Sequence, residues 1–580
     1  MLYKNHIRVL NIDLTNHKIL VENREDLTKY LGGVGVASKL LEDNIQADKD
    51  VFHESQPIIF SIGAISTIFP AITKTVAMFY SPLTKELGES YAGGRMAMAI
   101  QSAGYDALLI TGKSNSPIYL SISNNSVEFK DASAIWGMNN DDTGRIIRER
   151  EIGAGKRSIL RIGEAGENLV NYSSVCVDTY RHFGRLGLGA VMGSKNLKAI
   201  SIMGEGNIPI IDMPKYFKAY QTIYKKATAT DMMKKYHDLG TAGGVNSMNE
   251  LGGIPVENLS STHMEDSEPI SGEKFASKNL VRKTACTGCP VGCIHIGQFR
   301  KEFDDEGYEY ENINVSYDYE LIFALGSYLG IYSTDEILEV IEAVEKAGLD
   351  AISCGVCLGW ATEAYSNSLV TLDDIILPLE FGNKNNYIKA IEFISSRKNK
   401  FYHILGQGSK IASETYGGQE YAMHYAGNET AGYHTGYGSV LGSAVGARHS
   451  HLCNGGYSVD QSGTFSPEEV VDKILKEEIE RNIINSLVGC LFARKVYDRD
   501  TILLALNSVG YEYTSDDLSN IALENYKTKL RIKKMLGFDL LAVKIPKRFF
   551  ETTGMRQTLV DENTMKKMIT LYNEKIEKLL

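Results

Sequence analysis

The sequence predicts an α+β protein, with a β-rich N-terminal region followed by two mainly helical regions. Short runs of β-branched and aromatic residues, separated by glycine-rich turns, fill residues 1–208. After a linker-like segment, GEGNIPIIDMP, apolar residues recur three and four positions apart, which is the period of a helix. We expect domains at residues 1–208, 209–410 and 411–580, and a chain of 580 residues is long enough for three such units.

Nine segments of the first region have the composition of strands. They are Ile7–Leu14, Lys18–Asn23, Pro57–Ala64, Lys74–Tyr80, Ala107–Gly112, Ile118–Ser123, Ser126–Lys130, Arg157–Gly163 and Leu197–Gly204. Five segments beyond residue 208 have helical periodicity. They are Met213–Leu239, Thr334–Ala347, Asn386–Ser396, Pro467–Leu487 and Ser515–Met535.

Glycines of the first region gather in three clusters, at Leu31–Gly35, Ala92–Arg95 and Phe183–Lys198. Free amides on such turns suit phosphate oxygens, and nearby cations strengthen this interpretation. These cations are Lys74, Arg95, Arg185 and Lys195. No cluster has the dinucleotide-binding or P-loop pattern, so neither a nicotinamide nor a nucleoside triphosphate site is predicted.

The overall charge excludes some classes of partner. The net charge is −11 and no run rich in Lys or Arg occurs, which argues against nucleic acid and against an acidic membrane surface. No segment has about 18 consecutive apolar residues, and the first residues lack the pattern of a signal peptide. We therefore expect a soluble, cytoplasmic protein whose eight cysteines are reduced or bound to metal.

The segment ACTGCPVGC, Ala285–Cys293, is the strongest sign of chemistry. Cys286, Cys289 and Cys293 have the spacing C-x2-C-x3-C, and the intervening Gly and Pro residues let three thiolates converge on a metal or cluster. An iron–sulfur cluster is favoured over zinc, because zinc sites usually pair two C-x2-C knuckles. From the residues alone the fourth ligand stays open. The candidates are Cys490, Cys453, and the pair Cys354 and Cys357.

Several collinear segments together resemble the aldehyde:ferredoxin oxidoreductase family of tungsten-dependent pterin enzymes. They include YLGGVGVASKLL, SPLTKELGESYAGGRMAMAIQSAGYDALLITGKS, RIGEAGENLVNYSSVCVD, GRLGLGAVMGSKNLKAI, GTAGGVNSMNELGGIPVENL and ACTGCPVGC, and the resemblance covers nearly the full chain. It implies a β saddle under a tungsten or molybdenum ion that two pyranopterins hold without a protein thiolate. It also implies two helical domains that close over this ion, and one [4Fe–4S] cluster beside a pterin.

The resemblance also assigns cofactor residues. The cluster ligands are Cys286, Cys289, Cys293 and, as the fourth, Cys490. The phosphate contacts are Lys74, Ala92, Gly93, Gly94 and Arg185, and a magnesium ion bridging the pterin phosphates is a further expectation. Two turns hold the pterins, EKAGLD with Gly348, Leu349 and Asp350, and NSLVGC with Asn485 and Gly489. The second turn departs from the family pattern, because it has Asn for Asp and lacks the Gly-Leu order.

The catalytic pair implied by the resemblance is Glu320 in YDYEL and His451 in HSHLC, with Glu309 and His449 as second choices. Such a pair suits oxidation of an aldehyde to its acid, which needs a base and a donor to the substrate oxygen. Electrons are expected to leave through the cluster to ferredoxin or an iron–sulfur subunit, and a homo-oligomer is an open expectation. The alternatives are an electron-transfer or scaffold relative without an active metal, and a reductase of activated acids in a larger complex.

Overall fold

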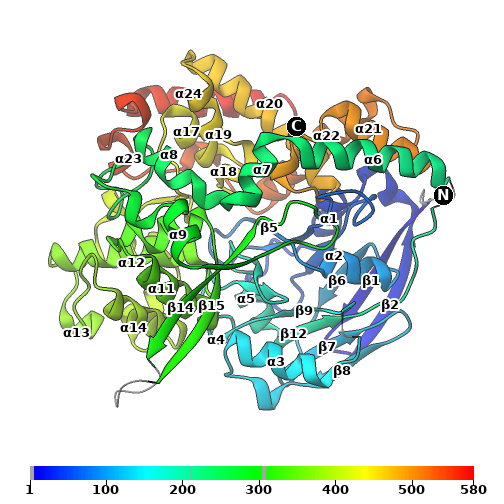
Figure 1. Cartoon of the computed structure of the whole chain (residues 1–580), viewed down its shortest axis with the longest axis horizontal. Coiled ribbons are helices and arrows are strands. Elements are labelled where there is room, and N and C mark those ends of the chain that lie inside the picture. The colour runs from blue at the N-terminus through cyan, green and yellow to red at the C-terminus, as the bar shows by residue number, and fades with distance from the viewer. Residues whose placement is uncertain (1–4, 154, 211, 303–308) are drawn as a thin grey trace.

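The computed structural model describes residues 5–153, 155–210, 212–302 and 309–580. Two sheets, blue to cyan in Figure 1, form the N-terminal part, and the green to red remainder is mainly helical. The predicted α+β class is confirmed. Within the described residues, no helix has both the length and the apolar character needed to cross a membrane.

Each of the two N-terminal sheets has six strands. The first has the order β2-β1-β6-β3-β4-β5, with β1 Ile7–Asp13, β2 Lys18–Arg24, β3 Ile58–Ser61, β4 Thr75–Tyr80, β5 Leu87–Ala92 and β6 Ala107–Thr111. The second has the order β11-β10-β9-β12-β7-β8, with β7 Ile118–Ile122, β8 Val127–Asp131, β9 Ser158–Arg161, β10 Val175–Val177, β11 Arg181–Phe183 and β12 Leu197–Ile202. All nine predicted strands are present, whereas β5, β10 and β11 were not predicted.

The two sheets share one topology. In each, the first and last strands along the chain pair in parallel, β1 with β6 and β7 with β12, while the other neighbours are antiparallel. The edge strands β5 and β11 contact each other. The glycine loops that follow them, Ala92–Arg95 and Phe183–Leu186, therefore occupy equivalent places in the two halves of the domain.

Helices of the N-terminal domain were not predicted. They are α1 Gly33–Asn44, α2 Met96–Ser102, α3 Asn140–Arg150, α4 Glu164–Glu167 and α5 Leu188–Ser194. The cluster Leu31–Gly35 is thus the start of a helix, and a Cβ on Gly33 would lie 2.4 Å from the carbonyl oxygen of Ser486. This glycine permits close packing against the last helical domain. A core between the sheets includes Leu10, Phe60 and Phe183.

The five predicted helical segments are helical. Met213–Leu239 is divided into α6 Met213–Ala229 and α7 Asp231–Asp238, because Thr230 caps the second helix by accepting a hydrogen bond from the amide of Met233. The other four are α11 Thr334–Ala347, α14 Lys384–Ser395, α20 Pro467–Ser486 and α22 Ser515–Met535. A three-stranded antiparallel sheet, β13 Leu280–Thr284, β14 Ile294–Glu302 and β15 Tyr310–Tyr317, was not predicted.

Shorter elements complete the helical part. They are α8 Gly244–Glu250, α9 Gly272–Lys278, α10 Tyr319–Leu325, α12 Ala351–Ser366, α13 Leu372–Ile375, α15 Lys400–Leu405, α16 Ser409–Tyr416, β16 His424–Tyr425, β17 Asn428–Glu429, α17 Tyr437–Val445, α18 His451–Asn454, α19 Gly456–Ser462, α21 Arg499–Ser508, α23 Arg548–Glu551 and α24 Glu562–Glu577. One core joins Trp360 and Tyr402 to Leu441 and Tyr526, on both sides of residue 410. The domain boundaries at 208 and 410 stay predictions.

Candidate active site

The cysteine knuckle is the loop between β13 and β14. Its backbone turns back on itself, since the amide of Cys289 donates to the carbonyl of Cys286 at 3.0 Å. Cys289, Cys293 and Cys490 pack against one shared core. Burial, helped by the neighbouring thiols with Cys490 first among them, raises the pKa of the Cys293 thiol to about 12. The structure thus gathers the three knuckle cysteines and Cys490 in one region.

The other candidate ligands lie elsewhere. Cys354 and Cys357 are fully buried in the large helical core, and burial raises the pKa of Cys453. Among the described residues, no three His, Cys, Asp or Glu side chains converge as the ligands of a single ion. Cys490, Cys286 and Cys289 are near enough to Cys293 to raise the pKa of its thiol, so the four cysteines fit the ligand set of one cluster.

The knuckle and the loop Ala92–Arg95 form one unit. The amide of Thr287 donates to the carbonyl of Gly94 at 3.1 Å. A Cβ on Gly93 would lie 2.5 Å from the sulfur of Cys286, so this position has no room for a side chain. The predicted phosphate loop therefore directly contacts a predicted cluster ligand.

A cavity of about 210 Å³ joins several of the predicted cofactor residues. It is lined by Lys74, Arg185, Asn485, Gly489 and Cys490, together with Glu89, Ser90, Tyr91, Gly184, Leu186, Asn428, Arg448, Ser450, Leu452, Leu491 and Phe492. These residues come from two distant parts of the chain, 74–186 in the N-terminal sheets and 428–492 in the helical part, and none of them lies between residues 209 and 410.

Arg185 has an unused donor at this cavity. Its Nε lies 3.2 Å from an Asp350 carboxylate oxygen, and one Nη donates to the carbonyl of Glu429 at 2.7 Å. The other Nη is buried and has no hydrogen-bond partner among the described residues. A buried, unsatisfied guanidinium nitrogen is costly unless a ligand accepts from it. The site therefore fits an anionic group such as a pterin phosphate.

The two predicted pterin turns differ in the structure. Gly348, with φ 78°, ends α11, and Asp350 then caps α12 by accepting from the amide of Ser353 at 3.0 Å. In the second turn the left-handed residue is Val488, with φ 51°, and Gly489 follows it. The carbonyl of Val488 accepts from the amide of Lys74 at 3.1 Å. The altered residue order thus places a strained, β-branched residue where the first turn has glycine.

Glu320 and His451 contact each other. They lie in the first turns of α10 and α18, whose caps are Asp318 and Ser450. Nε2 of His451 lies 3.2 Å from Oε1 of Glu320. The two atoms are not aligned as a hydrogen bond, and neither Glu320 Oε1 nor His451 Nδ1 has such a partner among the described residues. Burial raises the pKa of Glu320 to about 7, and burial together with Arg185 lowers that of His451.

Three tyrosines enclose this pair, and sequence reasoning missed them. The ring of Tyr433 lies 5.0 Å from that of His451 and 4.4 Å from that of Tyr457, while Tyr319 stacks on Tyr433 at 5.1 Å. Their rings shield the carboxylate from water, which explains why its charged form is disfavoured. Only the position of Tyr319 beside Glu320 could have signalled this enclosure.

The second choices for the pair are placed differently. Glu309 and the neighbouring Glu311 are exposed at the start of β15. His449 is buried, with Nε2 3.1 Å from both Glu86 and Lys533, so its ring is held in an ion network. The predicted phosphate cation Lys195 is also engaged, since it donates to the carbonyls of Glu54 and Gly112 at 2.7 and 3.1 Å.

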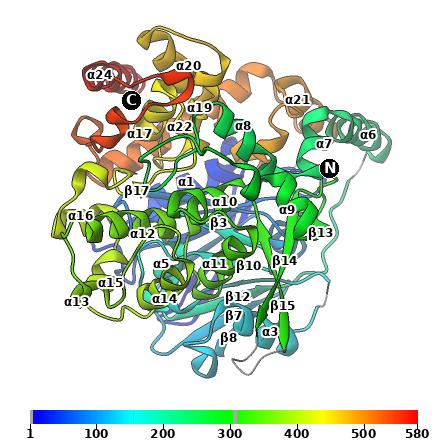
Figure 2. The ribbon, with the colours of Figure 1, turned by 60° about the vertical axis from the view of Figure 1, so that its left-hand side comes forward.

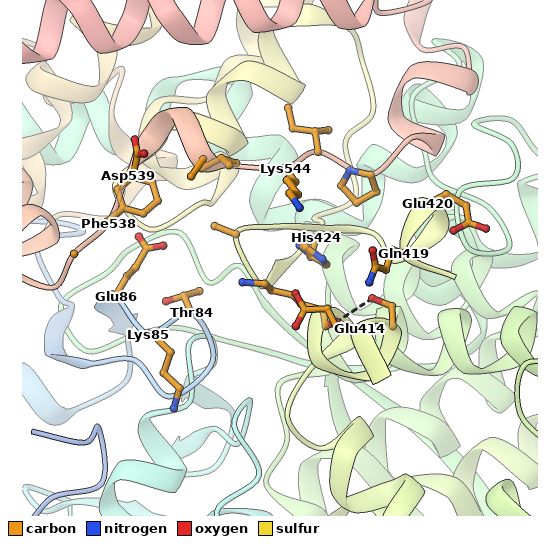
Figure 3. A pocket seen from close by; sticks show the side chains of 18 of the residues that line it. Thr84, Lys85, Glu86, Glu414, Gln419, Glu420, His424, Phe538, Asp539 and Lys544 are labelled. Carbon is orange, nitrogen blue, oxygen red and sulfur yellow. Dashed lines mark hydrogen bonds between the residues drawn. The ribbon is translucent and has the colours of Figure 1, made fainter. Parts of the chain in front are cut away.

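A larger groove, of about 760 Å³, contains none of the predicted site residues. Figure 3 shows side chains from separate parts of the chain around it, among them Glu86, Glu414 and Lys544. Cations and carboxylates alternate along its walls, so the groove does not present one sign of charge. The smaller cavity beside Arg185 is the candidate active site, because the predicted residues and the unsatisfied donor meet there.

Comparisons with known proteins identify the family of this chain. The family model described as the N-terminal domain of aldehyde ferredoxin oxidoreductase matches residues 9–204, and the model of domains 2 and 3 matches residues 218–576. The tungsten-containing aldehyde ferredoxin oxidoreductase of Pyrococcus furiosus is 32% identical over 95% of this chain and 92% of that protein. The enzyme of the same name from Thermococcus kodakarensis is 31% identical over 95% and 92%.

Two other similarities extend the comparison. The aliphatic sulfonate oxidoreductase WOR-like subunit of Pyrococcus furiosus is 30% identical over 77% of this chain and 71% of that protein. The solved active-site complex BamBC of benzoyl coenzyme A reductase, with 1,5-dienoyl-CoA, superposes with a TM-score of 0.84. It covers 98% of this chain and 94% of its own, but at 19% identity it shows the fold alone.

The matching family models and relatives define an oxidoreductase. The chain belongs to the aldehyde ferredoxin oxidoreductase family.

Proposed function

We propose that this protein oxidises an aldehyde to its carboxylic acid at a tungsten or molybdenum bis-pyranopterin group, and passes the electrons through one [4Fe–4S] cluster to a ferredoxin-type acceptor. The observation that carries the proposal is the contact of 3.2 Å between Glu320 and His451. His451 lies between Ser450 and Leu452, which both line the cavity that contains Arg185. An acid–base pair thus adjoins the anion-binding donors.

The residues that would hold the cofactor are those of the cavity and the knuckle. Arg185, Lys74 and the amides of Ala92–Gly94 would bind pterin phosphates, with or without a bridging magnesium ion, and the turns at Gly348–Asp350 and Asn485–Gly489 would bind the pterin rings. Cys286, Cys289, Cys293 and Cys490 would bind the cluster. When bound, the metal–pterin group supplies the two-electron oxidant.

The chain's own residues manage protons. Oxidation of RCHO with water gives RCOOH, two electrons and two protons, so a base must accept a proton from water or the hydrated aldehyde. Glu320, whose pKa is raised to about 7, is ionised often enough near neutral pH to do so. His451, which burial keeps neutral, can donate a hydrogen bond to the substrate oxygen. The tyrosines around them exclude bulk water.

The alternatives predict different behaviour. A scaffold relative would have no reason to keep a buried carboxylate and an unsatisfied Arg185 nitrogen beside the cavity, because both destabilise the fold. A reductase of activated acids would use the same site in the opposite direction. The comparison with BamBC does not favour it, since the likeness is one of fold.

Anaerobic purification followed by metal analysis and an aldehyde-dependent assay with a viologen dye tests the proposal. We expect tungsten or molybdenum, about four iron atoms per chain as one cluster requires, and dye reduction that depends on aldehyde. Iron without tungsten or molybdenum, and without turnover, would favour the scaffold. The reductase would be favoured if metal-loaded protein oxidises reduced viologen in the presence of an activated acid but does not reduce viologen in the presence of an aldehyde.

A further inference from the structure

Arg181 of β11 lies between the cysteine knuckle and the glycine loop that follows β5, and it is not among the residues that the family resemblance assigns. A Cβ on Gly93 would lie 2.5 Å from the sulfur of Cys286 and 3.5 Å from Cδ of Arg181. A Cβ on Gly94 would lie 3.8 Å from Cγ of Arg181. The side chain of Arg181 therefore packs along the two glycines, beside the first cysteine of the knuckle.

A second cysteine of the knuckle is close to the same side chain. Burial has the largest influence on the pKa of the Cys293 thiol and raises it, whereas the positive charge of Arg181 acts in the opposite direction. Strands β5 and β11 contact each other, and the amide of Thr287 joins the knuckle to the carbonyl of Gly94. Figure 2 shows β13 and β14, which flank the knuckle, in front of the N-terminal sheets. The structure therefore holds Arg181 beside the place where the cysteines would bind a cluster.

The guanidinium group of Arg181 has an unused donor. Its Nε is buried and has no hydrogen-bond partner among the described residues. A buried N–H without an acceptor is costly, because it has lost its hydrogen bonds to water. Arg185 lines the cavity that fits a phosphate, whereas Arg181 does not, so the two arginines serve different parts of the site. The sulfur atoms of a cluster and its ligands are the acceptors that this donor would meet.

Neither neighbouring carboxylate is paired with Arg181 in the described part of the chain. Asp178, in the same hairpin, accepts a hydrogen bond from the amide of Arg95 at 2.9 Å. Burial raises the pKa of Glu345 to about 8, although the nearby charge of Arg181 acts against this, so Glu345 is mostly protonated at pH 7. Arg181 therefore brings an unpaired positive charge to the cluster site.

We propose that Arg181 raises the reduction potential of the [4Fe–4S] cluster through its positive charge and its free Nε donor. This inference rests on the proposed function, because it assumes that the knuckle holds the cluster. Reduction adds one electron, and therefore one negative charge, to the cluster. A nearby cation and a hydrogen bond to sulfur stabilise the reduced form more than the oxidised form.

The higher potential has a consequence for turnover. Each aldehyde that is oxidised releases two electrons, and the cluster passes them to the ferredoxin-type acceptor one at a time. A cluster that is easier to reduce accepts each electron more readily. Arg181 is thus a positioning and tuning residue for electron transfer, and it touches neither the aldehyde nor the acid–base pair.

The test is a redox titration of full-length, cofactor-loaded protein, followed by electron paramagnetic resonance of the reduced four-iron cluster. Arg181→Met removes the charge and the donor but keeps an unbranched side chain. We expect a signal of normal intensity, with an equilibrium constant for reduction at least about tenfold lower. For a one-electron couple, tenfold corresponds to a potential about 59 mV more negative. Arg181→Lys, which keeps the charge without the guanidinium group, should lie between wild type and Arg181→Met.

A matched control is Arg300→Met on β14. Arg300 is exposed, and its place along the strand puts it roughly 20 Å from Cys293. This variant should keep the wild-type potential, because solvent and salt screen a charge at that distance.

An unchanged potential in Arg181→Met would overturn the inference. Loss of pterin from Arg181→Met at the wild-type potential would also overturn it, because Arg181 would then bind a phosphate. Should Arg181→Met fail to assemble its cluster, the neutral variant Arg181→Gln must show a more negative potential, and a potential at or above that of wild type would overturn the inference. A wild-type protein without any four-iron signal would overturn the proposed function and this inference together.

Discussion

Nε2 of His451 lies 3.2 Å from Oε1 of Glu320, although the two residues lie in the first turns of separate helices in different parts of the chain. Burial favours the neutral forms of both groups. Near neutral pH the proton of the pair is therefore held by, or released from, Glu320, while the imidazole of His451 stays neutral.

The pH dependence of turnover should show this arrangement. Burial raises the pKa of Glu320 to about 7, and a base works only when ionised, so kcat/KM should rise with pH through about 7 and then level off. Measuring initial rates of dye reduction between pH 5 and 9 at saturating dye checks this. In Glu320→Gln the residual rate should lose that rising limb. A wild-type rate that falls as the pH rises through 7 would mean that the protonated carboxyl is the active form.

The cluster ligands can be tested without turnover. Cys490→Ser, or the same change at Cys286, Cys289 or Cys293, should remove the electron paramagnetic resonance signal of the reduced four-iron cluster, because each supplies one thiolate. Cys453→Ser should keep the signal, since this buried thiol lies apart from the knuckle, near Arg448 and Glu89. A full-intensity four-iron signal in Cys490→Ser would show that another residue is the fourth ligand.

Retention of the pterin group should depend on Arg185 and Lys74. Arg185→Ala removes the buried donor that has no protein partner, and Lys74→Ala removes a second cation from the cavity wall. Each charge-assisted contact to phosphate is worth about 1.5–3 kcal/mol, so the double variant should lose most of its pterin and tungsten during purification. Lys389→Ala, on the exposed face of α14, is the control. If the double variant retains as much pterin and metal as Lys389→Ala, a phosphate role for Arg185 and Lys74 is contradicted.

A buried ion network fixes α22 to the first domain and gives a pH-dependent stability. Burial opposes ionisation of Glu86, but Lys533 and His449 outweigh it and lower its pKa to about 2, below the ordinary 4.5. The ionised carboxylate of Glu86 therefore stabilises the fold at pH values above its ordinary pKa of 4.5, and this stabilisation is lost as the pH falls toward 2. Lys533→Met should lower the thermal unfolding temperature at pH 7, because breaking a buried pair costs about 3–5 kcal/mol.

The size of that loss should shrink as the pH approaches 3, where the carboxyl of the variant is neutral and needs no partner. Melting curves of wild type and Lys533→Met between pH 3 and 7 measure this difference. An exposed pair gives the control, since Lys566→Met on α24 removes only a solvent-screened contact to Glu562. A constant difference across this pH range would show that Lys533 stabilises the fold by packing rather than by its charge.

The parts of the fold that could be predicted have a strong local signal. Thr334–Ala347 and Ser515–Met535 were predicted to the residue, because their apolar positions follow the helical period and acidic residues begin them. Strand β5 has the sequence LGESYA, which has poor strand propensity. It is a strand because Glu89 finds Lys529 at 2.7 Å and Arg448 in the folded protein, contacts that no local pattern encodes.

Some residues of the candidate site could be predicted from the sequence, and others could not. The cysteine spacing alone predicted the knuckle, and the family resemblance supplied Glu320, His451 and Arg185, which the structure brings close together. Tyr433 and Tyr457 could not be predicted, since single tyrosines carry no motif and their role depends on stacking between distant segments. Helix α1 was missed because its glycines suggested a ligand cradle, whereas Gly33 serves close packing against the end of α20.

The most direct test of the account is the turnover of Glu320→Gln relative to Glu311→Gln, each normalised to its tungsten or molybdenum content. Glu320 is half-buried, with its Oε1 buried beside His451, whereas Glu311 is exposed on β15, so one change removes the proposed base and the other is a matched control. We predict that Glu320→Gln keeps its metal and cluster signal yet loses about 10²–10⁴ in kcat/KM for aldehyde, the usual contribution of a general base, while Glu311→Gln keeps the wild-type rate. Near-normal turnover in metal-loaded Glu320→Gln would contradict the account.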